Sequence, residues 1–496
     1  MEDTIPPEYS SMQPTSGPIA SEWTQTPQEQ RQVRAQGDVP QSTSETTTLK
    51  TTQMELTPSA AGTETTLPIP PPSPNEVRNP VANATIQAHP HLFAIVTPIK
   101  ADRFERLLST HPNRPLVESM IKGLREGFWP YAITEGRNVP DTVIYPNHRL
   151  TGEEMAFVRE QRDQEIALGR YSSSFGPNLL PGMQTSPIGV VPKPRSNKLR
   201  MIVDQSAGEF ALNSYVSRSD AGIRLDNLSD LRKLLVDFYR VHGRGPRWIF
   251  KTDVSQAYRR LPAHPLWQIK QVISIDGQNH VNRCIDFGGR GSGKLWCLFF
   301  GLVVWAAIKV RGIEGLCHYV DDAFGFDDTE ELVYYAKYDA KYPAKQVKFL
   351  QLLDDIGCPH DKPKQLFFRA GTVLGFHVDP QSMTLSLPED SREDLIKSLR
   401  DFTSGNRSHT LREWLKILGR CNWALRVHPL LGLALQSSHR TLKGKIEMSG
   451  KVVVNGQVKE DLNWFADRVK ESNGLRMLEL LDWDESEADA AVICDA

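Results

Sequence analysis

The spacing of hydrophobic and polar positions divides the chain into two helical parts with a part rich in short strands between them. In the first helical part, apolar residues recur at helical spacing over Pro115–Leu124, with proline at the first position of the predicted helix. A second helix is predicted to begin after Thr151-Gly-Glu-Glu154, which has the pattern of a capping box. Beyond residue 390 the helical period returns, and Thr410-Leu-Arg-Glu413 is a further capping box.

The middle part has the short β-branched runs and the turns of an antiparallel sheet. Ile188–Val191 and Leu199–Val203 are predicted to form a hairpin, and the basic, turn-rich residues between them would be its tip. Arg247–Thr252 is a further predicted strand, followed by a helix-like stretch. Leu316–Tyr319 and Ala323–Phe326 are predicted to form a tight second hairpin.

The longest apolar run, Leu295–Ile308, has fourteen residues. A bilayer-spanning helix needs about 20 apolar residues, so this run predicts a buried core helix, and we expect no membrane partner. The N-terminus lacks the basic and then apolar pattern of a signal peptide, and six cysteines without a CxxC pair exclude a disulfide scaffold and common zinc fingers. We expect a reducing compartment, the cytoplasm or the nucleus.

The two ends of the chain differ in composition and charge from its body. Of the first 75 residues, 42 are Ser, Thr, Pro or Gln, so we expect residues 1–88 to be a disordered tail. Residues 89–175 are predicted to be a helical lead-in without a catalytic constellation. The net charge is −6 over residues 1–75, +11 over 76–476 and −7 over 477–496, and a basic body of this kind is compatible with a nucleic-acid partner.

Adjacent carboxylates stand at the predicted turn of the second hairpin, in Val320-Asp-Asp322. A solvated turn is the simpler interpretation of such residues, but apolar and aromatic flanks indicate a turn that emerges from a buried sheet. Asp253 follows a strand as well, where an aspartate is most often a helix N-cap. Aspartates from two strands that converge on one spot are the ligands of a two-metal phosphoryl-transfer site.

Two further segments could contact phosphates. The tip of the first hairpin carries Lys193, Arg195, Lys198 and Arg200, which are either a solvated turn or a grip on a triphosphate. The segment Phe287–Trp296 is rich in glycine and matches the first part of a P-loop. Leu295 stands where a P-loop needs Ser or Thr to bind magnesium, so a turn that lets backbone approach a bound nucleotide is the better interpretation.

The order and combination of these elements resemble the reverse transcriptases of retroelements, above all the LTR retrotransposons and the tyrosine-recombinase (DIRS-like) elements. The resemblance extends from about residue 100 to the C-terminus. Pro192-Lys-Pro to Asp204 is similar to the fingers hairpin of that family, Asp253–Tyr258 to its first palm motif, and Phe287-Gly288 to the start of its second. Tyr319-Val-Asp-Asp322 matches the YxDD box, the most specific of the motifs. Farther along the chain, Lys364 stands where the fourth palm motif of the family has a lysine. Val373–Phe376 is similar to the primer-grip region, and Gly419–Trp423 resembles a stretch just past the thumb.

The resemblance implies an α+β polymerase right hand, with fingers and palm over 176–380, thumb and connection helices over 381–475, and a truncated ribonuclease H start over 476–496. It implies template-directed addition of deoxynucleotides to a primer on an RNA or DNA template. Its cofactors would be two Mg²⁺ ions, with Mn²⁺ as a substitute.

The resemblance also implies roles for single residues. Asp253, Asp321 and the Val254 carbonyl would bind the metal ions, and Asp322 would support them. Lys193, Lys198 and Arg200 would hold the triphosphate, Phe287 and Gly288 would line the nucleotide site, and Lys364 would protonate the pyrophosphate. Tyr258 would exclude the 2′-hydroxyl, although an ordinary core aromatic is the alternative.

The chain departs from the family at two places. Gly293 follows Ser292 where the family usually has proline, and Gly adds backbone freedom there, which puts processivity in doubt. The sequence Ala488–Ala496 is similar to the first strand of ribonuclease H and stops at the first catalytic aspartate, Asp495, so we expect no cleavage of RNA in a hybrid.

Two other functions remain open from the sequence. The first is a catalytically inactive, retroelement-derived nucleic-acid-binding protein, which the intact aspartates argue against and which the expected lack of protease, integrase and complete ribonuclease H domains argues for. The second is an RNA-directed RNA polymerase, which Tyr258 and the Tyr-Val before the aspartates argue against. The sequence leaves the oligomeric state open.

Overall fold

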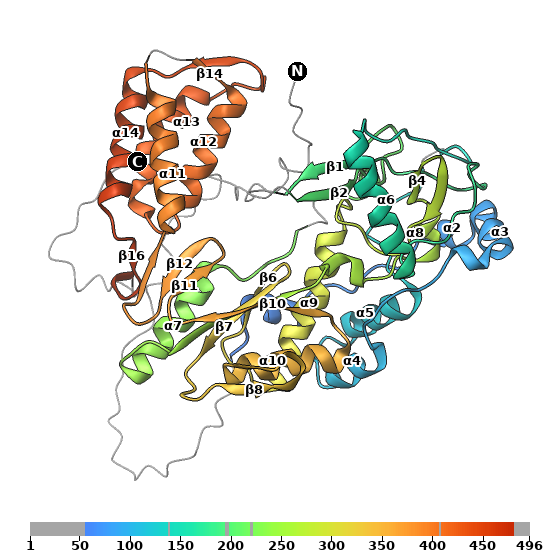
Figure 1. Cartoon of the computed structure of the whole chain (residues 1–496), viewed down its shortest axis with the longest axis horizontal. Coiled ribbons are helices and arrows are strands. Elements are labelled where there is room, and N and C mark those ends of the chain that lie inside the picture. Colours follow the sequence, from blue (N-terminus) through green and yellow to red (C-terminus); the bar gives the residue numbers. More distant parts are fainter. Residues whose placement is uncertain (1–54, 137–138, 194–197, 219–221, 406–407, 481–496) are drawn as a thin grey trace, which may run out of the picture. The chain divides into compact units, whose positions relative to one another are not determined.

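The structure is a computed structural model that describes residues 55–136, 139–193, 198–218, 222–405 and 408–480. The expected tail over residues 1–54, Arg195 at the hairpin tip and the expected ribonuclease H strand over 488–496 lie outside the described residues. The described chain is a mixture of helices and small antiparallel sheets (Figure 1).

The N-terminal boundary of folded structure lies earlier than the sequence indicates. We expected a disordered tail to residue 88, but residues 55–88 contain α1 (Pro58–Thr63), α2 (Pro74–Val77) and α3 (Pro80–Ala88), so the expectation is wrong for this part. Helix α1 packs against the core helix α9, and the buried carboxylate of Asp226 accepts hydrogen bonds from the backbone N–H and the Oγ of Ser59 at 2.8 and 2.6 Å. Contacts with a distant part of the chain therefore order a segment whose own composition is typical of disorder.

The helical lead-in has the predicted elements. Helix α4 (Ala101–Leu107) is followed by α5 (Arg114–Glu126), which buries the apolar stripe identified in the sequence. Helix α6 (Gly152–Ala167) begins with the predicted capping box, in which the side chains of Thr151 and Glu154 each accept a backbone N–H of the other residue.

A four-stranded antiparallel sheet in the order β10-β3-β7-β6 forms the centre of the described chain. Its strands are β3 (Trp248–Val254), β6 (Cys317–Tyr319), β7 (Asp322–Asp327) and β10 (His360–Phe368). Because side chains alternate along a strand, Phe250, Thr252 and Val254 share one face of β3, while Lys251 and Asp253 share the other. Phe250 and Val254 belong to the core cluster that contains α9 (Ser292–Lys309) and residues of α10 (Ala344–Ile356), so this face is buried. The opposite face is covered in part by the second core, which contains Ile249, and it carries the polar side chains of Lys251 and Asp253 toward the end of β3.

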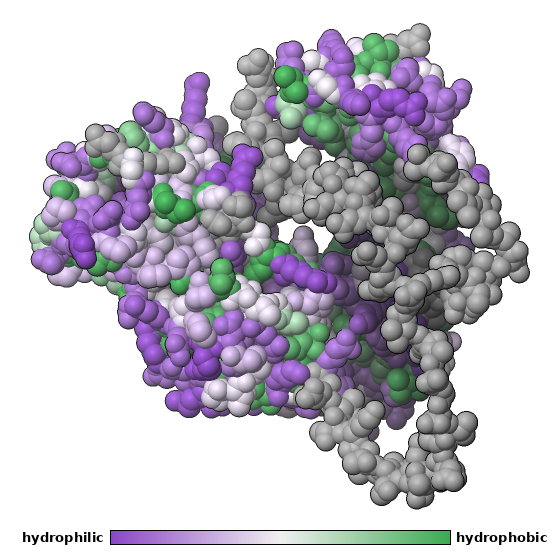
Figure 2. Space-filling model, turned by 180° about the vertical axis from the view of Figure 1, so that it is seen from behind, coloured by the Kyte–Doolittle hydropathy of each residue, from purple (hydrophilic) through white to green (hydrophobic). Residues whose placement is uncertain are grey.

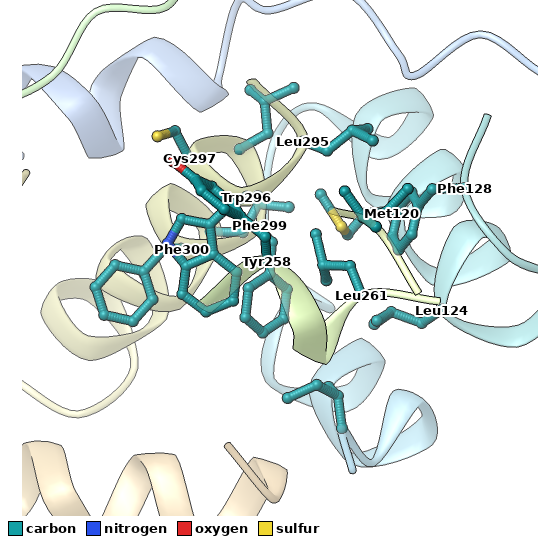
Figure 3. Close-up of a cluster of buried hydrophobic side chains, with 14 of the residues drawn as sticks. Met120, Leu124, Phe128, Tyr258, Leu261, Leu295, Trp296, Cys297, Phe299 and Phe300 are labelled. Carbon is teal, nitrogen blue, oxygen red and sulfur yellow. The ribbon is translucent and has the colours of Figure 1, made fainter. Parts of the chain in front are cut away.

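Helix α9 is the predicted core helix. It is long and apolar enough to cross a bilayer by length and composition, but 83% of it is buried, as expected for the centre of a folded domain. Its aromatic residues pack with Tyr258 and with side chains of α5 (Figure 3). On the face of the molecule in Figure 2, hydrophobic residues are scattered in small groups among hydrophilic ones.

The other elements are short hairpins and helices that extend these parts. The predicted first hairpin is confirmed as β1 (Ile188–Pro192) and β2 (Leu199–Val203), whose residues pair from Ile188↔Val203 to Pro192↔Leu199. The remaining elements of the middle part are η3 (Leu212–Tyr215), α7 (Leu228–His242), η5 (Ala257–Arg260), α8 (Pro265–Gln268), β4 (Val272–Ile275), β5 (Gln278–Val281), β8 (Val333–Tyr335), η6 (Ala336–Tyr338) and β9 (Ala340–Tyr342).

The C-terminal part forms a second hydrophobic core. A small sheet of β11 (Gly371–Val373), β12 (Phe376–Asp379), β13 (Thr384–Ser386) and β16 (Leu475–Arg476) packs with helices, and the ring of Trp423 lies 4.8 Å from that of Phe376. Helix α12 begins with the predicted capping box at Thr410. The other elements are α11 (Glu389–Thr403), β14 (Ser408–Thr410), α12 (Leu411–Ala424), η7 (Pro429–Leu435), α13 (Gln436–Leu442), β15 (Lys451–Val453), α14 (Gly456–Glu471) and η8 (Met477–Leu480).

The anchoring of α1 gives a test of the early boundary. Ser59→Ala removes one of the two hydrogen bonds from Ser59 to the buried Asp226, so we expect the free energy of unfolding to fall by about 1–3 kcal/mol. Urea denaturation of the variant measures this change, and Ser449→Ala, which alters an exposed serine, is the control. Equal midpoints for the two variants would show that α1 does not contribute to stability through Asp226.

Candidate active site

Three aspartates meet at one end of the central sheet. Asp253 at the end of β3 lies directly opposite Asp322 at the start of β7, and the two residues are cross-strand partners. Asp321 precedes Asp322 in the tight turn between β6 and β7, where Tyr319 pairs with Asp322. The backbone N–H of Val254 donates to the carbonyl of Asp321 at 3.4 Å, which ties the turn to the end of β3. The predicted hairpin with carboxylates at its turn is therefore confirmed.

The turn of this hairpin has an unusual backbone conformation. Val320 has a φ of +55°, in the left-handed region that a β-branched residue rarely adopts. The indole Nε1–H of the buried Trp296 on α9 donates to the carbonyl of Val320 at 2.8 Å. This bond from the core helix stabilises the conformation that brings Asp321 and Asp322 beside Asp253, and such local strain is commonly retained at functional sites.

Two lysines form ion pairs with these carboxylates. The Nζ of Lys364 on β10 lies 2.8 Å from Oδ1 of Asp253, and the Nζ of Lys251 on β3 lies 2.9 Å from Oδ2 of Asp322. Lys364 was expected near the site from the sequence, whereas Lys251 was missed. The alternation of side chains along β3 could have found it, because residues two apart on a strand lie on the same face.

The carboxylates at the turn are harder to ionise than ordinary aspartates. Burial raises the pKa of Asp321, and the neighbouring charges of Asp322 and Asp253 raise it further. Burial also raises the pKa of Asp322, and the ammonium group of Lys251 opposes that rise. The site therefore concentrates negative charge that the two lysines neutralise only in part.

The site offers oxygen atoms, the ligand type that magnesium prefers in proteins. In the part of the chain that the structure describes, no group of three or more His, Cys, Asp or Glu side chains gathers as a metal site. Magnesium sites that act on phosphates usually need only one or two carboxylates, because water and substrate phosphates fill the other positions. Asp253, Asp321 and the carbonyl of Val254 are oxygen donors of this kind, and a cation would relieve the repulsion that raises the pKa of Asp321.

An aromatic pair lies next to the carboxylates. Tyr258 is on the short helix η5, and its ring centroid lies 4.7 Å from that of Phe287, in an edge-to-face arrangement. Burial raises the pKa of the Tyr258 phenol, and Asp321 is among the neighbouring groups that add to the rise. Tyr258 is 9% exposed and Phe287 is 58% exposed, so the pair has one buried ring and one ring open to solvent.

The glycine-rich segment that follows Phe287 is a tight turn into α9 and not a P-loop, because no strand leads directly into it: β5 ends at Val281. A side chain at Gly289 would come within 2.4 Å of the Ser292 Oγ, and one at Gly291 within 2.3 Å of the Pro130 carbonyl oxygen. These two glycines are therefore needed for packing within the chain. At Gly293, where the sequence departs from its resemblance, a Cβ would meet only the Tyr258 hydroxyl at 3.9 Å.

The other predicted site residues lie on a separate element. Lys193 and Lys198 flank the tip of the β1–β2 hairpin, where the Lys193 N–H donates to the Lys198 carbonyl at 2.8 Å, and Arg200 is exposed on β2. The carbonyl of Gly288 accepts a hydrogen bond from the Asn213 side chain at 2.8 Å. The structure thus brings Asp253, Asp321, Asp322 and Lys364 together, with the Tyr258–Phe287 pair beside them.

Comparisons with known proteins show the fold. No model of a protein family and no curated protein matches the sequence. The structure is similar to that of the foamy viral protease–reverse transcriptase dRH in complex with double-stranded DNA, with a TM-score of 0.51 and 17% sequence identity, over 75% of this chain and 60% of that chain. A second structure of the foamy viral protease–reverse transcriptase with double-stranded DNA matches with a TM-score of 0.50 and 17% identity, over 76% and 73% of the two chains.

The chain therefore has a reverse-transcriptase-like fold, and the predicted α+β class with the polymerase right hand is confirmed. At 17% identity the similarity concerns the fold alone.

The pairing of Lys251 with Asp322 can be tested by measuring the free energy of unfolding of variants. Lys251→Met leaves a partly buried carboxylate without its partner beside two other carboxylates, so we expect a loss of about 1–3 kcal/mol at pH 7. The loss should shrink in the double variant Lys251→Met/Asp322→Asn. Lys362→Met, which removes an exposed lysine of the neighbouring strand β10, is the control.

The pH dependence of the Lys251→Met loss follows from the charge of Asp322. Removal of the ammonium group raises the already raised pKa of Asp322 further, so the ionised carboxylate becomes costlier in the folded state. The loss should be largest above the folded-state pKa of Asp322 and shrink as the pH falls through it. A loss that is independent of pH would contradict this explanation.

Proposed function

We propose that the chain is a template-directed DNA polymerase that uses an RNA template, that is, a reverse transcriptase of retroelement origin. The observation that carries the proposal is the meeting of Asp253 with the strained Asp321-Asp322 turn at the end of the central sheet, in a chain with a reverse-transcriptase-like fold. Its substrates would be deoxynucleoside triphosphates and a primer on an RNA or DNA template.

The reaction would be attack of a primer 3′-hydroxyl on the α-phosphate of the incoming nucleotide, with pyrophosphate as leaving group. Two Mg²⁺ ions, or Mn²⁺ in their place, held by Asp253, Asp321 and the Val254 carbonyl would stabilise the attacking and leaving oxygens. Asp322 remains with Lys251, which keeps one of the adjacent carboxylates out of the ligand set. Lys364 lies beside Asp253, where its ammonium group can reach the leaving pyrophosphate and give it a proton.

The other residues would bind and select the nucleotide. Lys193, Lys198 and Arg200 on the β1–β2 hairpin supply the charges for the triphosphate. Tyr258 packs against Phe287 with its ring fixed by burial, and a fixed ring beside the sugar excludes a 2′-hydroxyl. The exposed face of Phe287 and the backbone at Gly288 would line the same site.

One observation favours a second function. The ion pairs of Lys364 with Asp253 and of Lys251 with Asp322 neutralise two of the three carboxylates without any metal ion. Such a site would also suit a retroelement-derived protein that binds nucleic acid and has lost catalysis. Retention of nucleic-acid binding without extension of a primer would favour this alternative.

The role of the carboxylates as metal ligands can be tested by substitution. Asp321→Asn should lower the rate of primer extension on an RNA template by several orders of magnitude, because loss of a ligand forfeits several kcal/mol of charge stabilisation at about 1.4 kcal/mol per tenfold. Asp339→Asn, which alters an exposed aspartate, is the control. Binding of primer–template should change little. Extension by Asp321→Asn at a wild-type rate would show that Asp321 is not a metal ligand of the reaction.

The second prediction concerns the selection of the sugar. Tyr258→Ala should raise incorporation of ribonucleotides relative to deoxyribonucleotides, because the clash with the 2′-hydroxyl is removed. Tyr258→Phe keeps the ring and should keep the preference. Competition between the two nucleotide types in single-nucleotide extension measures the ratio, and an unchanged ratio in Tyr258→Ala would mean that Tyr258 is a core residue only.

A further inference from the structure

Two segments far apart in the sequence are joined by two neighbouring side-chain pairs of different chemistry. Tyr258 packs on Phe287, and the next residue on the first segment, Arg259, forms an ion pair with the preceding residue on the second, Asp286, at 2.9 Å. The exposed ring of Phe287 and the buried ring of Tyr258 thus stand directly beside a salt bridge in which both residues are buried.

Backbone hydrogen bonds join these two segments only beyond the salt bridge, on the side away from the aromatic pair. The N–H of Ile285 donates to the carbonyl of Leu261 at 2.9 Å, and Pro262 and Cys284 form an antiparallel bridge. Within the described chain, no backbone hydrogen bond joins residues 256–260 to residues 286–289. The spacing of the two segments at the aromatic pair therefore depends on side chains, and Arg259 is the one that makes several bonds there.

Arg259 is the centre of a buried network that reaches a third segment. Its Nη1 also donates to Oδ1 of Asn282 at 2.8 Å, and its Nη2 donates to Oε2 of Glu165 on α6 at 2.5 Å. Glu165 in turn accepts from Arg170 at 2.5 Å, and Arg170 donates to the side chain of Gln256 at 2.6 Å.

The network also includes a residue with an unusual backbone conformation. Gln256 has a φ of +56°, in the left-handed region, directly before the helix that carries Tyr258. Helix α6 lies in the lead-in, where the sequence predicts no catalytic constellation, and it supplies the carboxylate of Glu165 that holds this corner. Glu165, Arg259 and Asp286 are each at most 9% exposed, so the network is shielded from water.

Buried ion pairs of this kind contribute little net stability, because desolvation offsets most of their attraction. Their rigid, directional bonds can instead fix the relative position of the segments that they join. Arg suits this task, since its planar guanidinium offers five donors in a fixed geometry.

We propose that Arg259, held between Glu165 and Asp286, is a positioning residue that sets the gap between Tyr258 and Phe287 and thereby the selection of deoxyribose over ribose. The inference rests on the proposed polymerase function. Glu165 and Asp286 are buried, so both would act through the two aromatic rings and not by contact with a nucleotide.

The test uses Asp286→Asn, which keeps the shape of the side chain and removes its charge. The readout is the ratio of kcat/KM for a deoxyribonucleotide to kcat/KM for the matching ribonucleotide, which does not depend on the fraction of folded enzyme. We expect this ratio to fall about tenfold, a change typical of small displacements in a selective pocket. Glu165→Gln should lower it in the same direction.

The matched control is Asp355→Asn. Asp355 also holds two arginines, Arg103 and Arg311, but none of these residues belongs to the segments around Tyr258 and Phe287. This variant should lose stability and keep the sugar ratio. An equal fall of the ratio in both variants, or no fall in Asp286→Asn, would overturn the inference.

A second measurement needs no catalysis. Hydrogen–deuterium exchange of the free protein should become faster in peptides that cover 256–261 and 284–290 in Asp286→Asn, and stay at the wild-type rate there in Asp355→Asn. Unchanged exchange in Asp286→Asn would overturn the positioning role by itself. A wild-type chain that extends no primer would instead overturn the proposed function, and the sugar selection with it.

Discussion

The site depends on one constraint, the repulsion among carboxylates that gather at the end of one sheet. Two like charges about 4 Å apart repel by about 4 kcal/mol at an effective dielectric constant of about 20. Asp253, Asp321 and Asp322 are brought together by strand register and by a turn with a left-handed valine, so the chain holds them against this repulsion. Lys251 and Lys364 offset part of it, and the bond from Trp296 on the core helix holds the turn. The lysines and the buried core behind the sheet are therefore as much a part of the site as the aspartates.

Alternate residues of the central sheet serve the core and the polar site. Along β3, Phe250 and Val254 point into one core, while Lys251 and Asp253 point to the opposite face and form the polar site at the end of the strand. Ile249, farther from that end on the same face, is buried in the second core. In the turn after Phe287, Gly289 and Gly291 are required by close contacts within the chain, whereas Gly293 has room for a side chain. Packing requirements and chemical requirements thus fall on neighbouring residues and can be told apart only in three dimensions.

The features that local sequence determines were predictable. The hairpin at Asp321-Asp322, the capping boxes at Thr151 and Thr410 and the core helix α9 follow from periodicity and turn chemistry, and the structure has them. The features that depend on distant contacts were not. Helix α1 has a composition typical of disorder, and its anchor at Asp226 lies 167 residues away from Ser59. Glu165 and Arg259 look like surface charges in the sequence, because their pairing across 94 residues leaves no periodic trace.

The separation of the strands in sequence has a consequence for the way the protein is made. The ion pair of Lys364 with Asp253 joins residues 111 positions apart, and β10, which carries the lysine, is the last strand of the central sheet to be synthesised. Pairings over such distances form slowly, because the intervening chain must be ordered first. During translation, β3 and the aspartate turn leave the ribosome before β10 can complete the sheet. Before β10 emerges, a nascent chain of this protein therefore has an open sheet edge at β3 and no Lys364 to pair with Asp253, and an open edge of this kind favours aggregation.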